Sequence, residues 1–236
     1  MVVTIFATSV FCVADQPAVP LNVRIDQHLS EIHPGPELPV CSDGEFLRRV
    51  YLDLLGTLPS PIEARQFIQD TSADKRQTLI DRLLATPEFA DHMAQVFDVM
   101  LMERRPDKYV KSDEWKTYLL TSFRQEKPIN QLARELLQAD GVEEQSRAAA
   151  KFYLEREVEP NLLTREVGRM FFGMDVQCAQ CHDHPLIDDY RQADYFGLFA
   201  FVNRSYLFQP DKKKPAVIAE KAEGDAKFKS VFTDEE

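Results

Sequence analysis

The chain has 236 residues and a formal net charge of −11, from 28 Lys and Arg against 39 Asp and Glu. Its basic residues are dispersed rather than gathered in a stripe, which argues against a nucleic-acid partner. No apolar run reaches the roughly 18 residues of a membrane-spanning helix. Glycine is scarce and apolar residues recur at helical spacing, which predicts an all-α protein, a multi-helix bundle with irregular loops.

The first 14 residues, MVVTIFATSVFCVA, are apolar and end in a Cys-Val-Ala sequence that resembles a signal-peptidase site. They lack the basic residues that usually precede such a stretch. We interpret residues 1–14 as a signal-peptide remnant and expect an exported protein, in the periplasm or at the cell surface. Residues 15–40, which hold five of the 14 prolines, are predicted to form a linker around a short helix over Val23–Ile32.

Residues 41–203 carry repeated helix signals and are predicted to form one helical domain. Ser60 and Glu63 have the spacing of a capping box, and Pro61 and Pro87 each occupy a first helical position. In the helix that begins at Pro87, the side chains expected to point inward are Phe89, Met93, Val96, Phe97 and Met100. The predicted helices are Glu45–Leu55, Pro61–Asp70, Ala73–Ala85, Pro87–Glu103, 112–125, Ile129–Ala139, Arg147–Glu155, Leu162–Phe172 and Asp189–Asn203.

The last predicted helix is aromatic, and Tyr195, Phe196, Phe199 and Phe201 are expected to cover an apolar face. Residues 204–236 are interpreted as a lysine-rich connector to a downstream domain. Within them we predict a short strand at Ala216–Ala219 and a mobile C-terminal tail from Gly224 onward.

The segment Val176–Pro185 reads V-Q-C-A-Q-C-H-D-H-P and holds two of the four cysteines and two of the five histidines. C-x-x-C-H is the attachment signature of a c-type haem. Two thiols three residues apart face the same way on a helical turn, and the adjacent histidine reaches the iron. We therefore predict that Cys178 and Cys181 form thioethers to a covalent haem c and that His182 is the proximal ligand.

The distal iron ligand is less well specified, because every methionine precedes the motif. Met93 and Met100 lie seven residues apart on one predicted helical face, and His92 is adjacent, so these three are the candidates. The alternative for each methionine is a gap-filling role in the core. His184 is predicted to be a hydrogen-bonding neighbour of the haem site or a ligand itself.

Three other interpretations remain open. The segment C-x-x-C-H-x-H of Cys178–His184 can hold zinc or iron without haem, or its two cysteines can form a local disulfide in a structural or interaction module. A hydrolase can instead use nearby carboxylates as acid and base. These carboxylates are Asp183, Asp188, Asp189 and Asp194. We favour a module for electron transfer or redox sensing over an enzyme.

Three segments, in this order, resemble the planctomycete-type cytochrome c-associated domain of unknown function. They are F-L-R-R-V-Y-L-D-L-L-G-T-L-P-S-P, D-K-R-Q-T-L-I-D-R-L-L-A-T-P-E-F-A, and V-Q-C-A-Q-C-H-D-H-P followed by D-Y-F-G-L-F-A-F. The resemblance runs from about Arg24 to Asn203. It implies that the chain is the N-terminal piece of a longer exported multidomain protein. From the haem motif we expect a redox protein or an adjacent domain of that longer chain as partner.

Overall fold

The computed structural model describes residues 19–33, 35–36 and 39–227. The chain divides into two compact units, Met1–Ser42 and Asp43–Glu236. The predicted signal-peptide remnant, residues 1–14, lies outside the described residues, as do residues 228–236 of the predicted mobile tail.

The first unit contains helix α1 (Leu21–Ile32), which confirms the predicted short helix and begins two residues earlier. Pro20 precedes its first turn, where a missing backbone N–H costs nothing. None of the side chains of α1 is buried.

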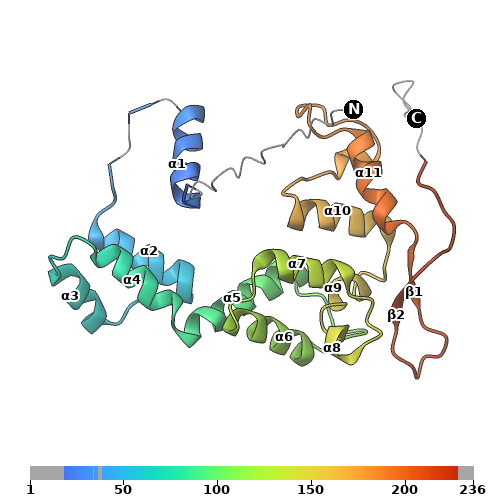
Figure 1. Cartoon of the computed structure of the whole chain (residues 1–236), viewed down its shortest axis with the longest axis horizontal. Coiled ribbons are helices and arrows are strands. Elements are labelled where there is room, and N and C mark those ends of the chain that lie inside the picture. Colours follow the sequence, from blue (N-terminus) through green and yellow to red (C-terminus); the bar gives the residue numbers. More distant parts are fainter. Residues whose placement is uncertain (1–18, 34, 37–38, 228–236) are drawn as a thin grey trace, which may run out of the picture. The chain divides into compact units, whose positions relative to one another are not determined.

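The second unit is helical, as predicted, and Figure 1 shows its helices in chain order. Most boundaries fall within a few residues of the predicted ones, because prolines and caps mark the helix starts. The helices are α2 (Asp43–Leu55), α3 (Pro61–Gln69), α4 (Lys75–Leu84), α5 (Pro87–Met102), α6 (Ser112–Arg124), α7 (Ile129–Gln138), α8 (Glu144–Arg147), α9 (Lys151–Leu154), α10 (Pro160–Phe171), the 3₁₀ turn η1 (Cys178–Gln180) and α11 (Gln192–Val202).

Helices α2, α3 and α4 share a small hydrophobic core, formed by Leu47, Tyr51, Phe67, Leu79 and Leu83. The predicted capping box at the start of α3 is confirmed: Glu63 N donates to Ser60 Oγ, and Ser60 N donates to the Glu63 carboxylate. The Tyr51 hydroxyl donates to the same carboxylate at 2.8 Å. The Glu63 carboxylate therefore caps the start of α3 and also links α3 to α2 through Tyr51.

A larger core lies among α5 to α10, and its fully enclosed side chains include Leu101, Met102, Trp115, Leu119, Leu136, Phe152, Leu154 and Leu163. The inward face predicted for α5 is wrong at Val96 and Met100, which are 40% and 38% exposed. Ala90 and Ala94 are buried instead. Their small side chains suit the close packing of α5 against α2 and α6.

The single helix predicted over Arg147–Glu155 is wrong, because the chain forms two one-turn helices there, α8 and α9. Every residue of α9 is buried, Lys151 included. The chain leaves α9 through Glu157 and Val158, whose φ angles of 55° and 53° are left-handed. A left-handed β-branched residue is strained, so surrounding contacts must hold this exit in place.

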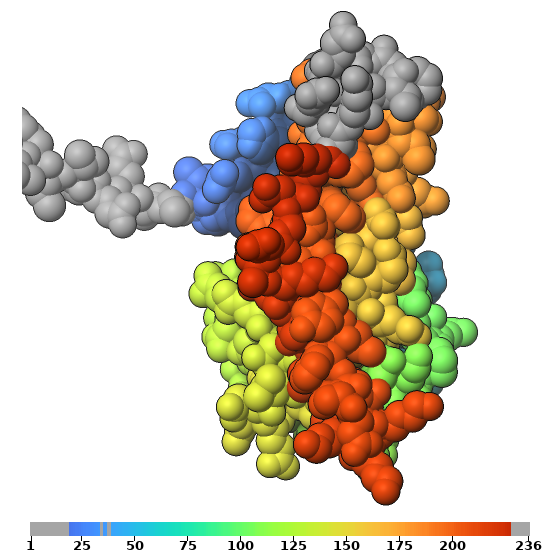
Figure 2. Space-filling model, turned by 90° about the vertical axis from the view of Figure 1, so that its right-hand side faces the viewer, coloured from blue at the N-terminus to red at the C-terminus, as the bar shows by residue number. Residues whose placement is uncertain are grey.

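The connector predicted after Arg204 forms an antiparallel hairpin of β1 (Ser205–Phe208) and β2 (Val217–Glu220), in which Phe208 pairs with Val217. The predicted short strand corresponds to β2, whereas β1 was missed. Ala216 is buried, and Ile218 N donates to the Asp140 carbonyl at 2.8 Å. Figure 2 shows this end of the chain lying along one face of the second unit.

Candidate functional site

The motif follows α10 after a sharp reversal at Gly173, whose φ of +67° suits glycine. Gly168 on α10 faces the returning chain. A Cβ at Gly168 would lie 3.1 Å from Val176 Cγ2 and 3.2 Å from the Met174 carbonyl oxygen. The close approach places Val176, fully buried, in a third small core, which it shares with Ala179, Tyr195, Met174, Phe196 and Phe199.

The two motif cysteines lie on one tight turn. Cys178–Gln180 form the 3₁₀ turn η1, and Cys181 N and His182 N donate to the Cys178 carbonyl at 3.1 and 3.2 Å. Residues three apart eclipse one another in a 3₁₀ turn, so the two cysteines share one side of it. Both thiols are exposed and unbridged, whereas Ala179 between them is buried.

His182 is exposed, and its Nδ1 lies 2.7 Å from the Asp183 carbonyl oxygen. A carbonyl oxygen only accepts, so this contact requires Nδ1 to carry the proton. The neutral ring then has its lone pair on Nε2. A histidine that binds a metal through one ring nitrogen usually donates the other N–H to a carbonyl or carboxylate. In a neutral ring, the contact with the Asp183 carbonyl thus matches the arrangement expected of an Nε2 ligand.

His184 has the opposite tautomer. Its Nδ1 accepts from Leu186 N at 3.2 Å, so the neutral ring carries its proton on Nε2. Its backbone N–H donates to the Tyr190 carbonyl at 2.9 Å, and its ring meets the Tyr190 ring edge-on. Half-buried His184 thus closes the 184–190 loop, and ligation through Nε2 would cost it the bond from Leu186.

A polar network joins the motif turn to α10 and α11. Arg165 Nη1 donates to Gln180 Oε1 at 2.7 Å, and Gln180 Nε2 donates to Asn161 Oδ1 at 3.3 Å. The Tyr195 hydroxyl donates to the same Asn161 oxygen at 2.9 Å. Burial raises the pKa of Tyr195 to about 12, so its hydroxyl keeps the proton that this bond needs at neutral pH.

A second set of contacts fixes the far side of the turn. Gln192, only 6% exposed, donates from Nε2 to the Cys181 carbonyl at 3.2 Å. Its backbone N–H donates to Asp183 Oδ1 at 2.7 Å. Gln192 Oε1 is buried and has no hydrogen-bond partner within the described part of the chain. The start of α11 is therefore tied to the motif through both the side chain and the backbone of Gln192.

The structure does not gather the candidate distal ligands around this turn. His92, Met93 and Met100 lie on α5, which packs against α2 and α6, whereas η1 packs against α11. Figure 1 shows α5 apart from α11. His92 lies beside Gly56, where a Cβ would come within 2.5 Å of its Nδ1. The methionine that does lie beside the motif is Met174, in the third core.

The other predicted ligand and acid–base groups do not assemble either. In the ranges that the structure describes, no three His, Cys, Asp or Glu side chains are placed to hold a metal ion. Asp183 and Asp194 accept backbone N–H groups at the start of α11, from Gln192 and Arg191 respectively. Asp188 and Asp189 are exposed. Helix capping thus occupies two of the four carboxylates proposed for hydrolysis.

Of the aromatic face predicted for α11, Tyr195 is fully buried and Phe196 and Phe199 pack against it. The prediction is wrong for Phe201, which is 84% exposed. The reason is helical geometry: Phe201 lies two positions from Phe199, about 200° around the helix.

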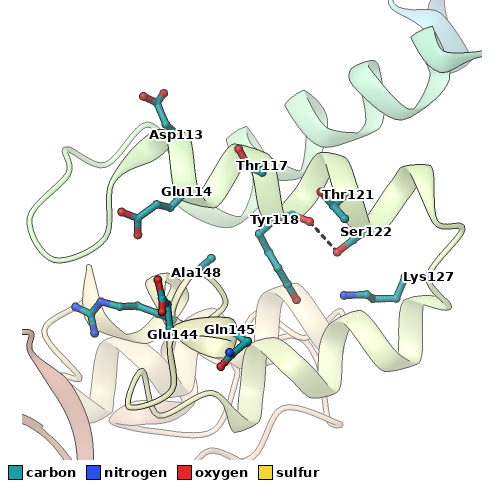
Figure 3. A pocket seen from close by; sticks show the side chains of 11 residues that line it. Asp113, Glu114, Thr117, Tyr118, Thr121, Ser122, Lys127, Glu144, Gln145 and Ala148 are labelled. Carbon is teal, nitrogen blue, oxygen red and sulfur yellow. Dashed lines mark hydrogen bonds between the residues drawn. The ribbon is translucent and has the colours of Figure 1, made fainter.

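Sequence reasoning missed a groove of about 720 Å³ between α6 and α8. Figure 3 shows Tyr118 extending into it, with Glu114 and Glu144 toward one end and Lys127 toward the other. The Tyr118 hydroxyl donates to Glu135 Oε2 at 2.9 Å, and burial together with this contact raises the pKa of Tyr118. No motif residue lines the groove. No sequence signal indicated it, because its walls come from separate segments.

Fold and site together define a mostly helical domain with a C-x-x-C-H turn on its surface. The family model of a "Protein of unknown function (DUF1549)", PSCyt2, matches residues 22–206, most of the chain. The chain belongs to this family, which confirms the predicted resemblance to a domain of unknown function. No curated protein and no solved structure matches it. Within the described residues, no helix has the length and apolar character needed to cross a membrane.

Proposed function

We propose that this domain binds one haem c covalently through Cys178 and Cys181, with His182 as an iron ligand. It then serves electron transfer or redox sensing in an exported protein, with a redox protein or an adjacent domain as partner. The observation that carries the proposal is the motif turn, on which two exposed, unbridged thiols accompany a histidine in the ligand tautomer.

The residues of the turn suit covalent attachment. Each thiol would add across one vinyl group: a sulfur–carbon bond forms, the S–H bond breaks, and the hydrogen passes to the other vinyl carbon. Addition of this kind is redox-neutral and consumes no oxidant. His182 would offer the Nε2 lone pair, while the Asp183 carbonyl holds the ring through Nδ1. When bound, the haem supplies a one-electron iron couple.

The segments that flank the motif in the sequence expose apolar side chains. Leu186, in the loop that follows the motif, is 88% exposed, and its neighbour Ile187 is 40% exposed. Phe172, at the end of α10, is 59% exposed. Burial of exposed apolar side chains against an apolar ligand such as haem would lower the free energy of the complex.

The test is export of the second unit together with α1 in cells that carry a c-type haem ligation system, followed by haem staining of a denaturing gel. We expect staining of the wild-type protein and none with Cys178→Ala plus Cys181→Ala. Cys41→Ala is the matched control, because Cys41 lies outside the motif, and it should stain like the wild type. Each single motif variant should retain at most one thioether, with a shifted haem absorption band.

The same preparations separate the alternatives. A folded, exported wild-type protein that never stains would refute the haem proposal. If that unstained protein holds stoichiometric zinc or iron in elemental analysis, the metal-site alternative replaces it. If it instead has no titratable thiol at Cys178 and Cys181, the disulfide alternative replaces it.

A further inference from the structure

The motif turn is too short to be stable by itself. It comprises one 3₁₀ turn, Cys178–Gln180, with two backbone bonds onto the Cys178 carbonyl. Isolated turns of this length lose more conformational entropy than so few bonds recover. Cys178, Cys181 and His182 are exposed, whereas side-chain hydrogen bonds tie the turn to α10 and α11.

Gln180 supplies the first of these contacts. It stands between the two cysteines, and its side-chain amide is engaged at both ends. Its Oε1 accepts from Arg165 at 2.7 Å, and its Nε2 donates to Asn161 at 3.3 Å. Both partners lie on α10. Because Tyr195 of α11 donates to the same Asn161 oxygen, the amide of Gln180 is locked into a network that spans both helices.

Gln192 supplies the second contact. Its Nε2 holds the carbonyl of Cys181, the residue that carries the second thiol, and its backbone N–H holds Asp183, the residue after the proposed iron ligand. The Oε1 of the same amide is buried without a partner in the described structure, which is unfavourable. Burial of this unpaired oxygen has an energetic cost. The hydrogen bond from Gln192 Nε2 to the Cys181 carbonyl is the side-chain contact that offsets it.

We propose that Gln180 and Gln192 are positioning residues for haem attachment, and the inference rests on the proposed function. They hold Cys178–His182 in the form that presents both thiols on one side before haem arrives. The benefit is entropic: two thioethers and one iron bond must form on the same ligand, and a turn that is already ordered loses less freedom when they do.

The test combines two measurements on Gln180→Ala and Gln192→Met. The first is amide hydrogen exchange at Cys181 and His182 in the haem-free protein, since both amides donate to Cys178. We expect roughly fivefold to tenfold faster exchange in each variant. The second is the fraction of protein that carries haem after co-expression with the ligation system, which should fall several-fold. Gln192→Met keeps the volume of the side chain, which protects the fold of the start of α11.

Two further variants separate positioning from a general structural role. Gln177→Ala is the matched control, because Gln177 is exposed in the same segment and its side chain makes no hydrogen bond to a described residue. It should behave like the wild type in both measurements. Gln180→Glu keeps the acceptor for Arg165 and loses the donor to Asn161, so it should recover part of the attachment that Gln180→Ala loses.

The outcomes distinguish the two proposals. If the wild type stains and the glutamine variants stain equally with unchanged exchange, the positioning inference is refuted and the haem proposal stands. If exchange accelerates but attachment does not fall, the inference is refuted as well. If the folded wild type never stains, the haem proposal fails first and the positioning inference fails with it.

Discussion

Around α9 and at the motif turn, polar side chains form hydrogen bonds that fix the backbone. The side chains around α9 are charged, whereas those at the motif are neutral amides. At α9, the Glu155 carboxylate accepts three backbone N–H groups of residues 108–110, at 2.9 to 3.0 Å. Lys151 Nζ donates to Asp107 at 2.8 Å and to the Val110 carbonyl. At the motif, neutral amides of Gln180 and Gln192 perform the holding.

The difference follows from what each region must keep out of water. The charges at α9 are buried, so each must be matched by an opposite charge or several hydrogen bonds, and removing one leaves the others uncompensated. The motif exposes its reactive groups, and the amides that bond to its turn are uncharged. We therefore expect substitutions at α9 to act on the free energy of unfolding, and substitutions at the motif to act on ligand attachment.

The largest effect is expected at Glu155. Glu155→Ala leaves the three N–H groups unsatisfied and removes a carboxylate 3.7 Å from the buried Lys151 amine, which should lower the free energy of unfolding by about 3–5 kcal/mol. Glu157→Ala is the matched control. Its exposed pair with Lys108 should contribute at most about 1 kcal/mol. Urea unfolding followed by circular dichroism measures both, and equal losses would contradict the contrast.

A smaller loss in the free energy of unfolding is expected at low pH, where Asp107 becomes protonated. The hydrogen bond from Lys151, followed by that from Ser112, lowers the pKa of Asp107 from 3.8 to about 2. Because the folded-state pKa is depressed, the contribution of Asp107 is fully present above pH 3.8 and is lost as the pH falls through about 2. For this partly exposed carboxylate we expect a contribution on the order of 1 kcal/mol.

Comparison with Asp107→Asn isolates that contribution. The variant should be less stable than the wild type at neutral pH, and the two should converge in the free energy of unfolding as the pH falls through about 2. Urea titrations across this range measure the convergence. Parallel curves with a constant gap would show that the Asp107 carboxylate does not titrate with the expected depressed pKa.

The smallest effect on stability is expected at the motif cysteines. In the haem-free protein, Cys178→Ala with Cys181→Ala removes two exposed side chains and should change the free energy of unfolding by at most about 0.5 kcal/mol. Val176→Ala, a fully buried change in the same segment, should cost about 2 kcal/mol. A cysteine variant as unstable as Val176→Ala would show that the thiols support the fold rather than only the site.

Sequence reasoning predicted those parts of the fold that depend on signals from neighbouring residues. Helices α3 and α5 begin at prolines that follow capping residues, and their starts were predicted correctly. The α8–α9 region has no such signal, and its apolar spacing suggested one helix. There the backbone follows side-chain bonds to residues about 45 positions away, which no local pattern records.

The candidate site divides in the same way. The spacing of Cys178, Cys181 and His182 predicted a helical turn, and the structure has a 3₁₀ turn over Cys178–Gln180. Spacing along α5 also suggested that His92, Met93 and Met100 are available as distal ligands. Periodicity reports which residues share a helix face, but it does not report which other helix that face meets.

The sequence by itself determined the helical class, the helix starts at prolines and caps, and the residues of the C-x-x-C-H turn, because all of these depend on neighbours within a few positions. Only the tertiary structure decided that Lys151 and Glu155 are buried, that β1 pairs with β2, and that the turn bonds to α10 through Gln180 and to α11 through Gln192. Those features depend on contacts between distant segments, and such contacts exist only after the chain has packed.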